Sequence, residues 1–160
     1  MIDDLLFALT FVAAIGCGLV AGIFFAFSTF VMKALARIPS AGGIAAMQSI
    51  NVVVINPWFM GAFFGTALAC LVLVVSSLFR LNESSAIYLL IGSLLYLIGT
   101  IGVTMVFNVP RNDALAAADP ESADGGKLWD GYVTSWTRWN HVRTAAALAA
   151  AILLTFALLR

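Results

Sequence analysis

The only histidine of the chain, His141, lies in a polar stretch, WTRWNHVRT at residues 136–144, just before the last apolar run. Polar side chains at the mouth of a membrane helix are costly, so they are expected to have partners or a function. A histidine in a partly dry site titrates near neutral pH and can accept a proton. Arginine and asparagine side chains beside it can stabilise the anion that forms. We therefore predict catalytic roles for His141, Arg143, Asn140 and Asn108.

Further polar and aromatic residues fall in the first and third loops, on the same side of the predicted bundle. Trp129, Tyr132, Trp136 and Trp139 recur at helical spacing, and such an aromatic stripe would hold a flat apolar ligand. The predicted substrate-binding residues are Trp136, Trp139, Tyr132, Arg111, Asn112, Gln48 and Asn51. Two alternatives stay open: the stripe belongs to an interfacial aromatic belt, or loop three pairs its own charges and leaves His141 an ordinary interfacial histidine.

Metal and cofactor motifs are scarce. One histidine and two cysteines in separate apolar runs are too few ligands for a zinc or di-iron centre, and Cys17 and Cys70 are expected to be small buried apolar residues. There is no phosphate-binding loop, dinucleotide fingerprint or Ser-His-Asp pattern. We expect no metal and no cofactor, with a haem held axially by His141 as the alternative.

The composition indicates an integral membrane protein. Of the 160 residues, 62% are hydrophobic and 10% charged, against about 25% charged in soluble domains. The apolar runs predict an all-α, four-transmembrane-helix bundle in one domain, residues 1–160, with spans at about 5–32, 58–79, 86–107 and 142–159. Loop one is expected to hold a short interfacial helix, and loop three a longer helical segment. A formal net charge of zero without a basic tract speaks against nucleic acid as a partner.

Small residues and polar residues recur at four-residue intervals within the spans. Ala14, Gly18, Gly22 and Ala26, and likewise Gly61, Gly65 and Ala69, predict close helix packing, in the bundle or against a second copy in a homo-oligomer. In span three, Tyr96, Thr100, Thr104 and Asn108 share one face, which is expected to point inward, towards other helices or a cavity.

Prolines and glycines predict where the helices begin and end. Asn56 followed by Pro57 is typical of a helix start, with asparagine as the cap. Pro110 is expected to end or bend span three, and Gly125–Gly126 to break loop three.

Four spans place both termini on one side of the membrane and loops one and three on the other. Six basic residues accompany these loops and two accompany the termini, which favours cytoplasmic loops one and three. The expected partners are the lipid bilayer, a small planar apolar ligand and a second copy of the chain.

Four blocks of the sequence resemble a known family: GLVAGIFFAFSTFVM in span one, AMQSINVVVINPWF in loop one, VFNVPRNDAL after span three, and WxxYxxxWTRWNHVRT before span four. Together they are similar to the DUF1772 group of small four-helix membrane proteins, often called the anthrone oxygenase family. The resemblance covers nearly the whole chain.

The resemblance implies a function. Fungal members similar to this group oxidise anthrones to anthraquinones with molecular oxygen and without a bound cofactor. Carried over, the residues that match the motif blocks are Asn108, Arg111, Asn112, Trp136, Trp139, Asn140, His141 and Arg143. The expected activity is a membrane-embedded, cofactor-independent oxygenase of anthrone-like or other planar phenolic substrates. The alternative is a non-catalytic membrane protein that binds a lipid, a quinone or haem between its helices.

Overall fold

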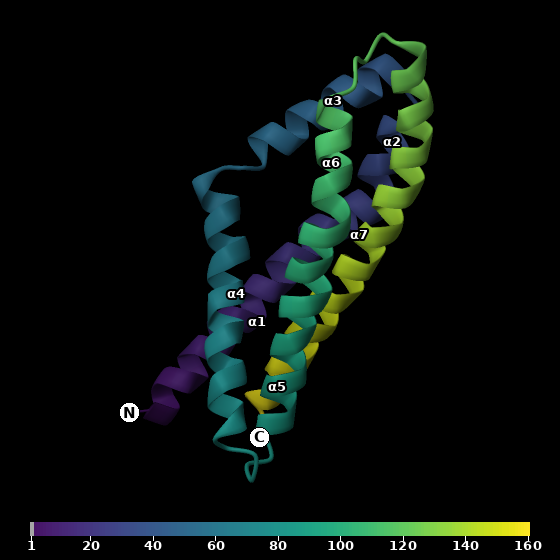
Figure 1. The fold of residues 1–160 in the computed structure, drawn as a ribbon. Coiled ribbons are helices and arrows are strands. Elements are labelled where there is room, and N and C mark those ends of the chain that lie inside the picture. The colour runs from purple at the N-terminus through teal and green to yellow at the C-terminus, as the bar shows by residue number, and fades with distance from the viewer. Residues whose placement is uncertain (1) are drawn as a thin grey trace.

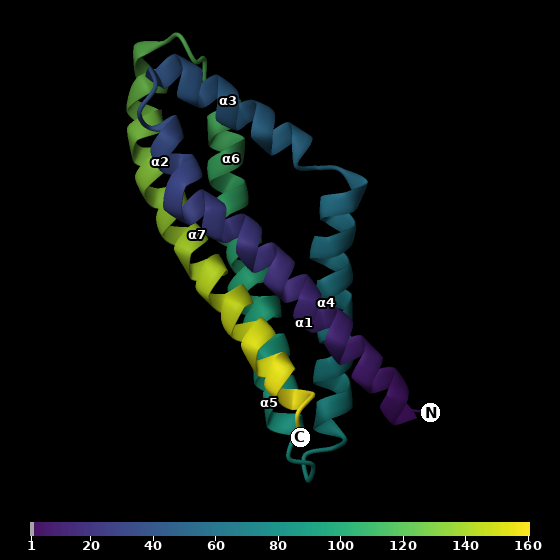
Figure 2. The same ribbon diagram turned by 180° about the vertical axis from the view of Figure 1, so that it is seen from behind.

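The computed structural model describes residues 2–160, which are almost entirely helical and contain no strand. Four helices are long and apolar enough to cross a membrane: Asp3–Leu35, Pro57–Leu78, Ala86–Ala116 and Ala123–Ala157. The predicted four-helix class is therefore confirmed, and the chain is a multi-pass integral membrane protein. Both termini lie at one end of the bundle, and the loops that follow the first and third spans lie at the other end (Figures 1 and 2).

The first span consists of α1 (Ile2–Ala26), the π-helical segment η1 (Phe27–Val31) and α2 (Met32–Leu35). The next helix, α3 (Ser40–Val53), lies across the end of the bundle and contacts α2, α6 and α7 (Figure 1). Then α4 (Pro57–Leu78) forms the second span. Its predicted cap is present, since the Asn56 side-chain oxygen accepts hydrogen bonds from the backbone N–H of Trp58 at 3.1 Å and of Phe59 at 3.0 Å.

The third span is longer than predicted. It runs through α5 (Ala86–Leu94), two π-helical segments, η2 (Leu95–Gly102) and η3 (Thr104–Asn108), and α6 (Val109–Ala116). The prediction that Pro110 ends this helix is wrong. Proline removes one backbone donor, and here it falls in the first turn of α6, directly after a π-helical segment in which the backbone hydrogen bonds are already shifted.

The fourth span lies within α7 (Ala123–Ala157), a helix of 35 residues. The predicted break at Gly125–Gly126 is wrong, because Ser122 caps the helix by accepting a hydrogen bond from the Gly125 N–H at 2.9 Å. A side chain at Gly125 would collide with the backbone oxygen of Asp119, so glycine is needed where the start of α7 lies close to that oxygen. The long rigid helix holds the whole 136–144 stretch in helical register.

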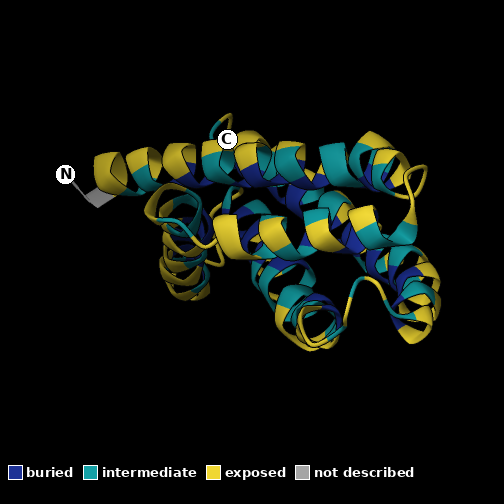
Figure 3. Cartoon of the chain, turned by 90° about the horizontal axis from the view of Figure 1, so that it is seen from above, coloured by how far each residue is buried: buried dark blue, intermediate teal, exposed yellow. Residues whose placement is uncertain are grey.

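Within the bundle, the predicted close packing of the glycine strips is wrong for four glycines, and their packing against a second copy stays a prediction. A Cβ atom added at Gly18, Gly22, Gly61 or Gly65 would meet nothing within 4 Å. Close approach falls at other glycines instead: Gly16 faces Thr66, and Gly99 faces Ala146. The first set therefore lies on the outer surface of the bundle, where exposed residues gather (Figure 3).

The inward direction of the polar stripe in span three is confirmed. Tyr96, Thr100 and Asn108 are buried, and the Tyr96 hydroxyl donates a hydrogen bond to the Phe63 carbonyl at 3.0 Å. Cys17 and Cys70 are buried and free, as expected. The core thus divides into an apolar half near the termini and a more polar half near the loops.

Candidate functional site

A cavity of about 240 Å³ lies in the loop-side half of the bundle. Its walls are mostly aliphatic and aromatic side chains from the first span, α3 and α4, such as Phe24, Met47 and Phe63. The polar groups that line it are few: Asn51, Thr104, Asn112 and Arg143, with Trp136 beside them. An apolar pocket with a few converging polar groups is the usual form of a small-molecule site.

Arg143 is the charged residue of this cavity. It is only 4% exposed, and it projects from α7 between aromatic rings. Its guanidinium carbon lies 4.1 Å from the centre of the Phe24 ring and 5.1 Å from that of Trp136, both cation–π contacts. Its Nε atom is buried and has no hydrogen-bond partner.

No carboxylate balances this charge within the part of the chain that the structure describes. The ion pairs of residues 2–160 join Arg80 to Asp3 and Glu83, and Lys127 to Asp124, all far along the chain from Arg143. The partners of Arg143 are neutral: it donates to Thr104 Oγ1 at 3.1 Å and to Asn140 Oδ1 at 2.6 Å. Burying a cation without a counter-ion is expensive, so such a site is suited to a ligand that brings the negative charge.

Asn140 holds this guanidinium in place. Its amide nitrogen donates to the Phe24 carbonyl and to the Ser28 hydroxyl, both at 2.7 Å, and its oxygen is left to accept from Arg143. Ser28 in turn lies 3.1 Å from the Thr144 hydroxyl. The first span and α7 are thus joined by buried hydrogen bonds directly beside the cavity.

Asn112 and the aromatic stripe form a second group, nearer the loops. The Asn112 oxygen accepts hydrogen bonds from the Tyr132 hydroxyl at 2.9 Å and from the Trp136 indole N–H at 2.8 Å. The rings of Trp129, Tyr132 and Trp136 stack along α7, with centres 5.6 and 6.1 Å apart. Of this group, Trp136 and Asn112 reach the cavity.

Several predicted site residues support the walls and do not line the cavity. Asn108 is buried and donates to the Trp136 carbonyl at 3.3 Å, while its own oxygen has no partner. Arg111 donates to the Ser135 hydroxyl at 3.1 Å and to the Phe107 carbonyl at 2.6 Å. Gln48 donates to the carbonyls of Leu115 and Ala118, and Trp139 stacks on Phe107 with ring centres 3.6 Å apart.

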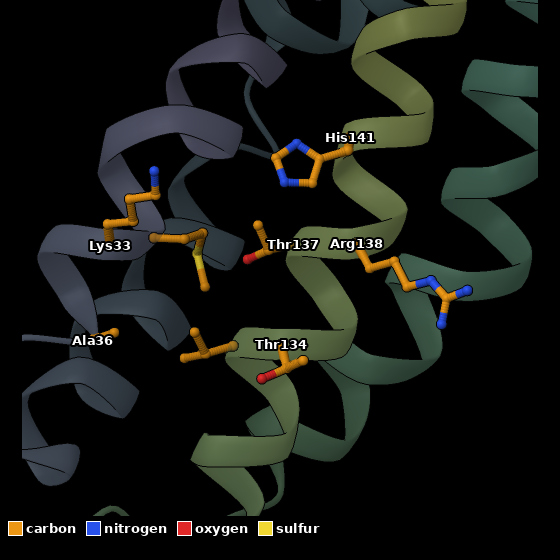
Figure 4. A pocket seen from close by; sticks show the side chains of 8 residues that line it. Lys33, Ala36, Thr134, Thr137, Arg138 and His141 are labelled. Carbon is orange, nitrogen blue, oxygen red and sulfur yellow. The ribbon is translucent and has the colours of Figure 1, made fainter.

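His141 lies apart from Arg143. It is exposed, and it lines a shallow depression of about 390 Å³ between the first span and α7 (Figure 4). The expected convergence of imidazole and guanidinium in one hollow is therefore absent. The reason is helical geometry, because residues two apart on an α-helix project about 200° apart. When Arg143 points inward, His141 points out.

Two cavity residues that contact the Arg143 guanidinium, Thr104 and Phe24, were not among the predicted site residues. Thr104 bonds Arg143 directly, and its place in the inward stripe of span three was the available signal. Phe24 lies under the guanidinium, and nothing in its sequence surroundings distinguishes it from the other phenylalanines of span one.

The fold and this cavity define a class: a multi-pass membrane protein with a buried arginine in a mostly apolar cavity. The sequence model of the family described as anthrone oxygenase matches residues 58–153, and the chain belongs to that family. The match spans α4 through most of α7 and includes Asn112 and Arg143. No curated protein and no solved structure matches the chain.

Proposed function

We propose that this protein is a membrane-embedded oxygenase that oxidises an anthrone-like or other planar phenolic substrate without a bound cofactor. One observation carries the proposal: the Arg143 guanidinium is buried in an apolar cavity and has no carboxylate partner among the described residues. Family membership points to the same kind of substrate.

The proposed role of Arg143 is to hold the substrate as an anion. An anthrone loses a proton from its central methylene carbon to give an enolate-like anion, whose charge rests mainly on oxygen. A charge-assisted hydrogen bond contributes about 1.5–3 kcal/mol, and one pKa unit corresponds to about 1.4 kcal/mol. The guanidinium therefore lowers the pKa of the bound substrate by about one to two units.

The anion then reacts with oxygen. It transfers one electron to O₂, the resulting radical and superoxide combine at the methylene carbon, and the hydroperoxide loses water to leave a carbonyl group. The sum is one CH₂ group plus O₂ giving one C=O group plus H₂O, so no external reductant is needed. Superoxide is also an anion, and Arg143 stabilises it as it forms.

Two versions of this proposal differ in the group that takes up the methylene proton. In the expected version, His141 removes the methylene proton. In the version that we favour, the neutral substrate binds, Arg143 lowers the pKa of its methylene group, and water at the loop-side end of the cavity takes up the proton, so that no protein base is needed. The exposed position of His141 and its absence from the cavity walls favour the second version.

The cavity is suited to a substrate dissolved in the bilayer. Phe64 and Met105 line it and are 51% and 56% exposed, so the cavity reaches the outer surface between α4 and the third span. Its volume is below the range of about 300–1,000 Å³ common for ligand pockets. A small flat molecule therefore suits it better than a phospholipid.

The test is oxygen uptake by purified protein in detergent or vesicles, with a hydroxylated anthrone as substrate. We expect Arg143→Gln to lower kcat/KM by about 10²- to 10³-fold, the usual effect of removing one anion-stabilising donor. Arg160→Gln, the same change at the opposite end of the bundle, is the control and keeps full activity. Its midpoint of thermal unfolding and that of Arg143→Gln should both stay near the wild-type value.

Three results would contradict the proposal. Undiminished turnover by Arg143→Gln would remove its central residue. A Soret band in the absorption spectrum of the active protein would point to haem. Tight binding of a quinone or lipid in the cavity, without oxygen uptake on any anthrone, would establish the non-catalytic alternative. The His141→Gln variant distinguishes the two versions of proton removal. Loss of turnover would support His141 as the base, and full turnover would support the version without a protein base.

A further inference from the structure

The depression beside His141 is separate from the cavity of Arg143 and plays no part in the version of the oxidation that we favour. Its lining residues come from the first span and from α7: Met32, Lys33, Ala36, Val133, Thr134, Thr137, Arg138 and His141. None of them is acidic, and three carry or can carry a positive charge. None of the ion pairs of residues 2–160 involves these three.

The side chains that point into this depression are complementary to a phosphate group. Figure 4 shows the His141 ring and the Lys33 side chain turned towards the space between the two helices, with Thr137 below them, while the Arg138 guanidinium points away. The Thr137 hydroxyl is buried and has no hydrogen-bond partner, whereas that of Thr134 donates to the Asp130 carbonyl at 3.2 Å. An ammonium group, an imidazole and a free hydroxyl are common phosphate ligands.

The depth of the depression matches the headgroup region. Counted back from Ala157 at 1.5 Å per residue, a hydrocarbon layer of about 30 Å reaches Thr137 after about 20 residues. The acidic residue on the same face of α7, Asp130, lies about 10 Å further out, in water. Lys33 directly follows the apolar run of span one.

Small residues line one face of α1 on the membrane side of this depression. Ala26, Gly22 and Gly18 recur there at four-residue intervals, and the π-helical segment η1 separates them from Lys33. A Cβ atom at Gly22 or Gly18 would meet nothing within 4 Å. From Lys33 to Gly22 the helix rises about 16 Å, close to the hydrocarbon depth of one leaflet.

We infer that the depression between the first span and α7 is a binding site for an anionic phospholipid, whose phosphate contacts Lys33, Thr137 and His141. One acyl chain lies along the Ala26–Gly22–Gly18 track. The site explains two features that the oxidation leaves unused: the outward histidine, and glycines that meet no neighbouring helix.

The experiment measures lipid binding to the full chain in a neutral detergent, by native mass spectrometry and by the shift in thermal unfolding. Phosphatidylglycerol is compared with phosphatidylcholine of the same acyl chains, and with glycerol 3-phosphate, which has no chain. We expect phosphatidylglycerol to bind at least about tenfold more tightly than phosphatidylcholine, and glycerol 3-phosphate to give no protection.

Two variants locate the site. Lys33→Gln/His141→Gln should abolish the preference for phosphatidylglycerol, whereas Lys127→Gln, which removes an exposed charge at the same end of the bundle, should keep it. Gly22→Leu, at a position with open space, should weaken both phospholipids by filling the track.

Equal binding of the two phospholipids, or an unchanged preference in the double variant, would overturn the inference. Full protection by glycerol 3-phosphate would show a phosphate site and no lipid site. If Lys127→Gln lost the preference for phosphatidylglycerol as fully as the double variant does, the lipid would be attracted only by the overall positive charge of this end of the bundle.

Discussion

At the scale of single residues, the arrangement around Arg143 depends on the neutrality of Asn140. An aspartate has nearly the same shape as asparagine, and at this position it would place a carboxylate 2.6 Å from the guanidinium. The charge of the side chain at position 140 therefore decides whether the positive charge of Arg143 is available to a ligand or is neutralised inside the protein.

We expect Asn140→Asp to lower kcat/KM by about 10- to 100-fold, because the new ion pair competes with the substrate anion for Arg143. The Ser28 hydroxyl can turn to donate to the new carboxylate, but the hydrogen bond to the Phe24 carbonyl is lost, so we expect a folded protein with a lower midpoint of thermal unfolding. The measurement is oxygen uptake on an anthrone, with thermal unfolding of the same sample. Unchanged turnover in a folded Asn140→Asp protein would show that the charge of Arg143 is not used.

Outside the membrane-spanning segments, one ion pair shifts the pKa of its arginine. Arg80 lies in the turn between α4 and α5, 2.7 Å from the Asp3 carboxylate and 3.4 Å from that of Glu83. The hydrogen bond to Asp3 raises the pKa of Arg80 above its ordinary value. The Asp3 carboxylate is exposed, and an exposed ion pair contributes little to stability, so the pair only links the start of α1 to this turn.

At the scale of elements, α3 closes the loop-side end of the cavity, and the Gln48 side chain bonds it to α6. The Gln48 amide nitrogen donates to the carbonyls of Leu115 at 2.9 Å and Ala118 at 3.0 Å, which lie at the C-terminal end of α6. The Leu115 carbonyl also accepts from the Ala118 N–H at 3.1 Å, and Gln48 adds side-chain hydrogen bonds at the end where the carbonyls of α6 run out of helical partners.

We expect Gln48→Leu to free α3 and to leave the Ala118 carbonyl unpaired, at a cost of about 1–3 kcal/mol in the free energy of unfolding. Amide hydrogen exchange in α3 should become faster, and KM should rise because Met47, Ile50 and Asn51 on α3 form part of the cavity wall. Ser49→Ala, an exposed neighbour, is the control. Unchanged exchange in Gln48→Leu would mean that packing alone holds α3.

The elements also show which features a sequence can reveal. Apolar runs and the Asn56–Pro57 signal are local, so four spans and the start of α4 were predictable. The extent of α6 and α7 was not, because whether Pro110 or Gly125 breaks a helix depends on the hydrogen bonds available around it. The inward face of α7 is fixed by packing: Asn140 and Arg143 were rightly grouped together, three residues apart, while His141 belongs to the opposite face.

At the scale of the whole molecule, the cavity lies where the second span separates from the third. Here α4 contacts α5 and η2 near the termini, and α3 covers the wider, loop-side end (Figure 1). The exposed edges of the cavity, Phe64 on α4 and Met105 on the third span, face the hydrocarbon. Under the proposed function, a neutral substrate dissolved in the bilayer would enter the cavity of Arg143 directly through this opening.

We expect Met105→Trp to narrow this opening and to lower kcat/KM by about tenfold. The control is Val106→Trp, because Val106 is 62% exposed on the same segment and is not part of the cavity wall. Both variants add the same bulk to a lipid-facing surface, and such a change is tolerated where nothing packs against it. Stopped-flow oxidation of an anthrone already dissolved in the vesicles separates access from chemistry: slower binding with an unchanged rate of the bound substrate supports the lateral route. Equal losses in the two variants would show that the substrate reaches the cavity from the water-facing end, beneath α3.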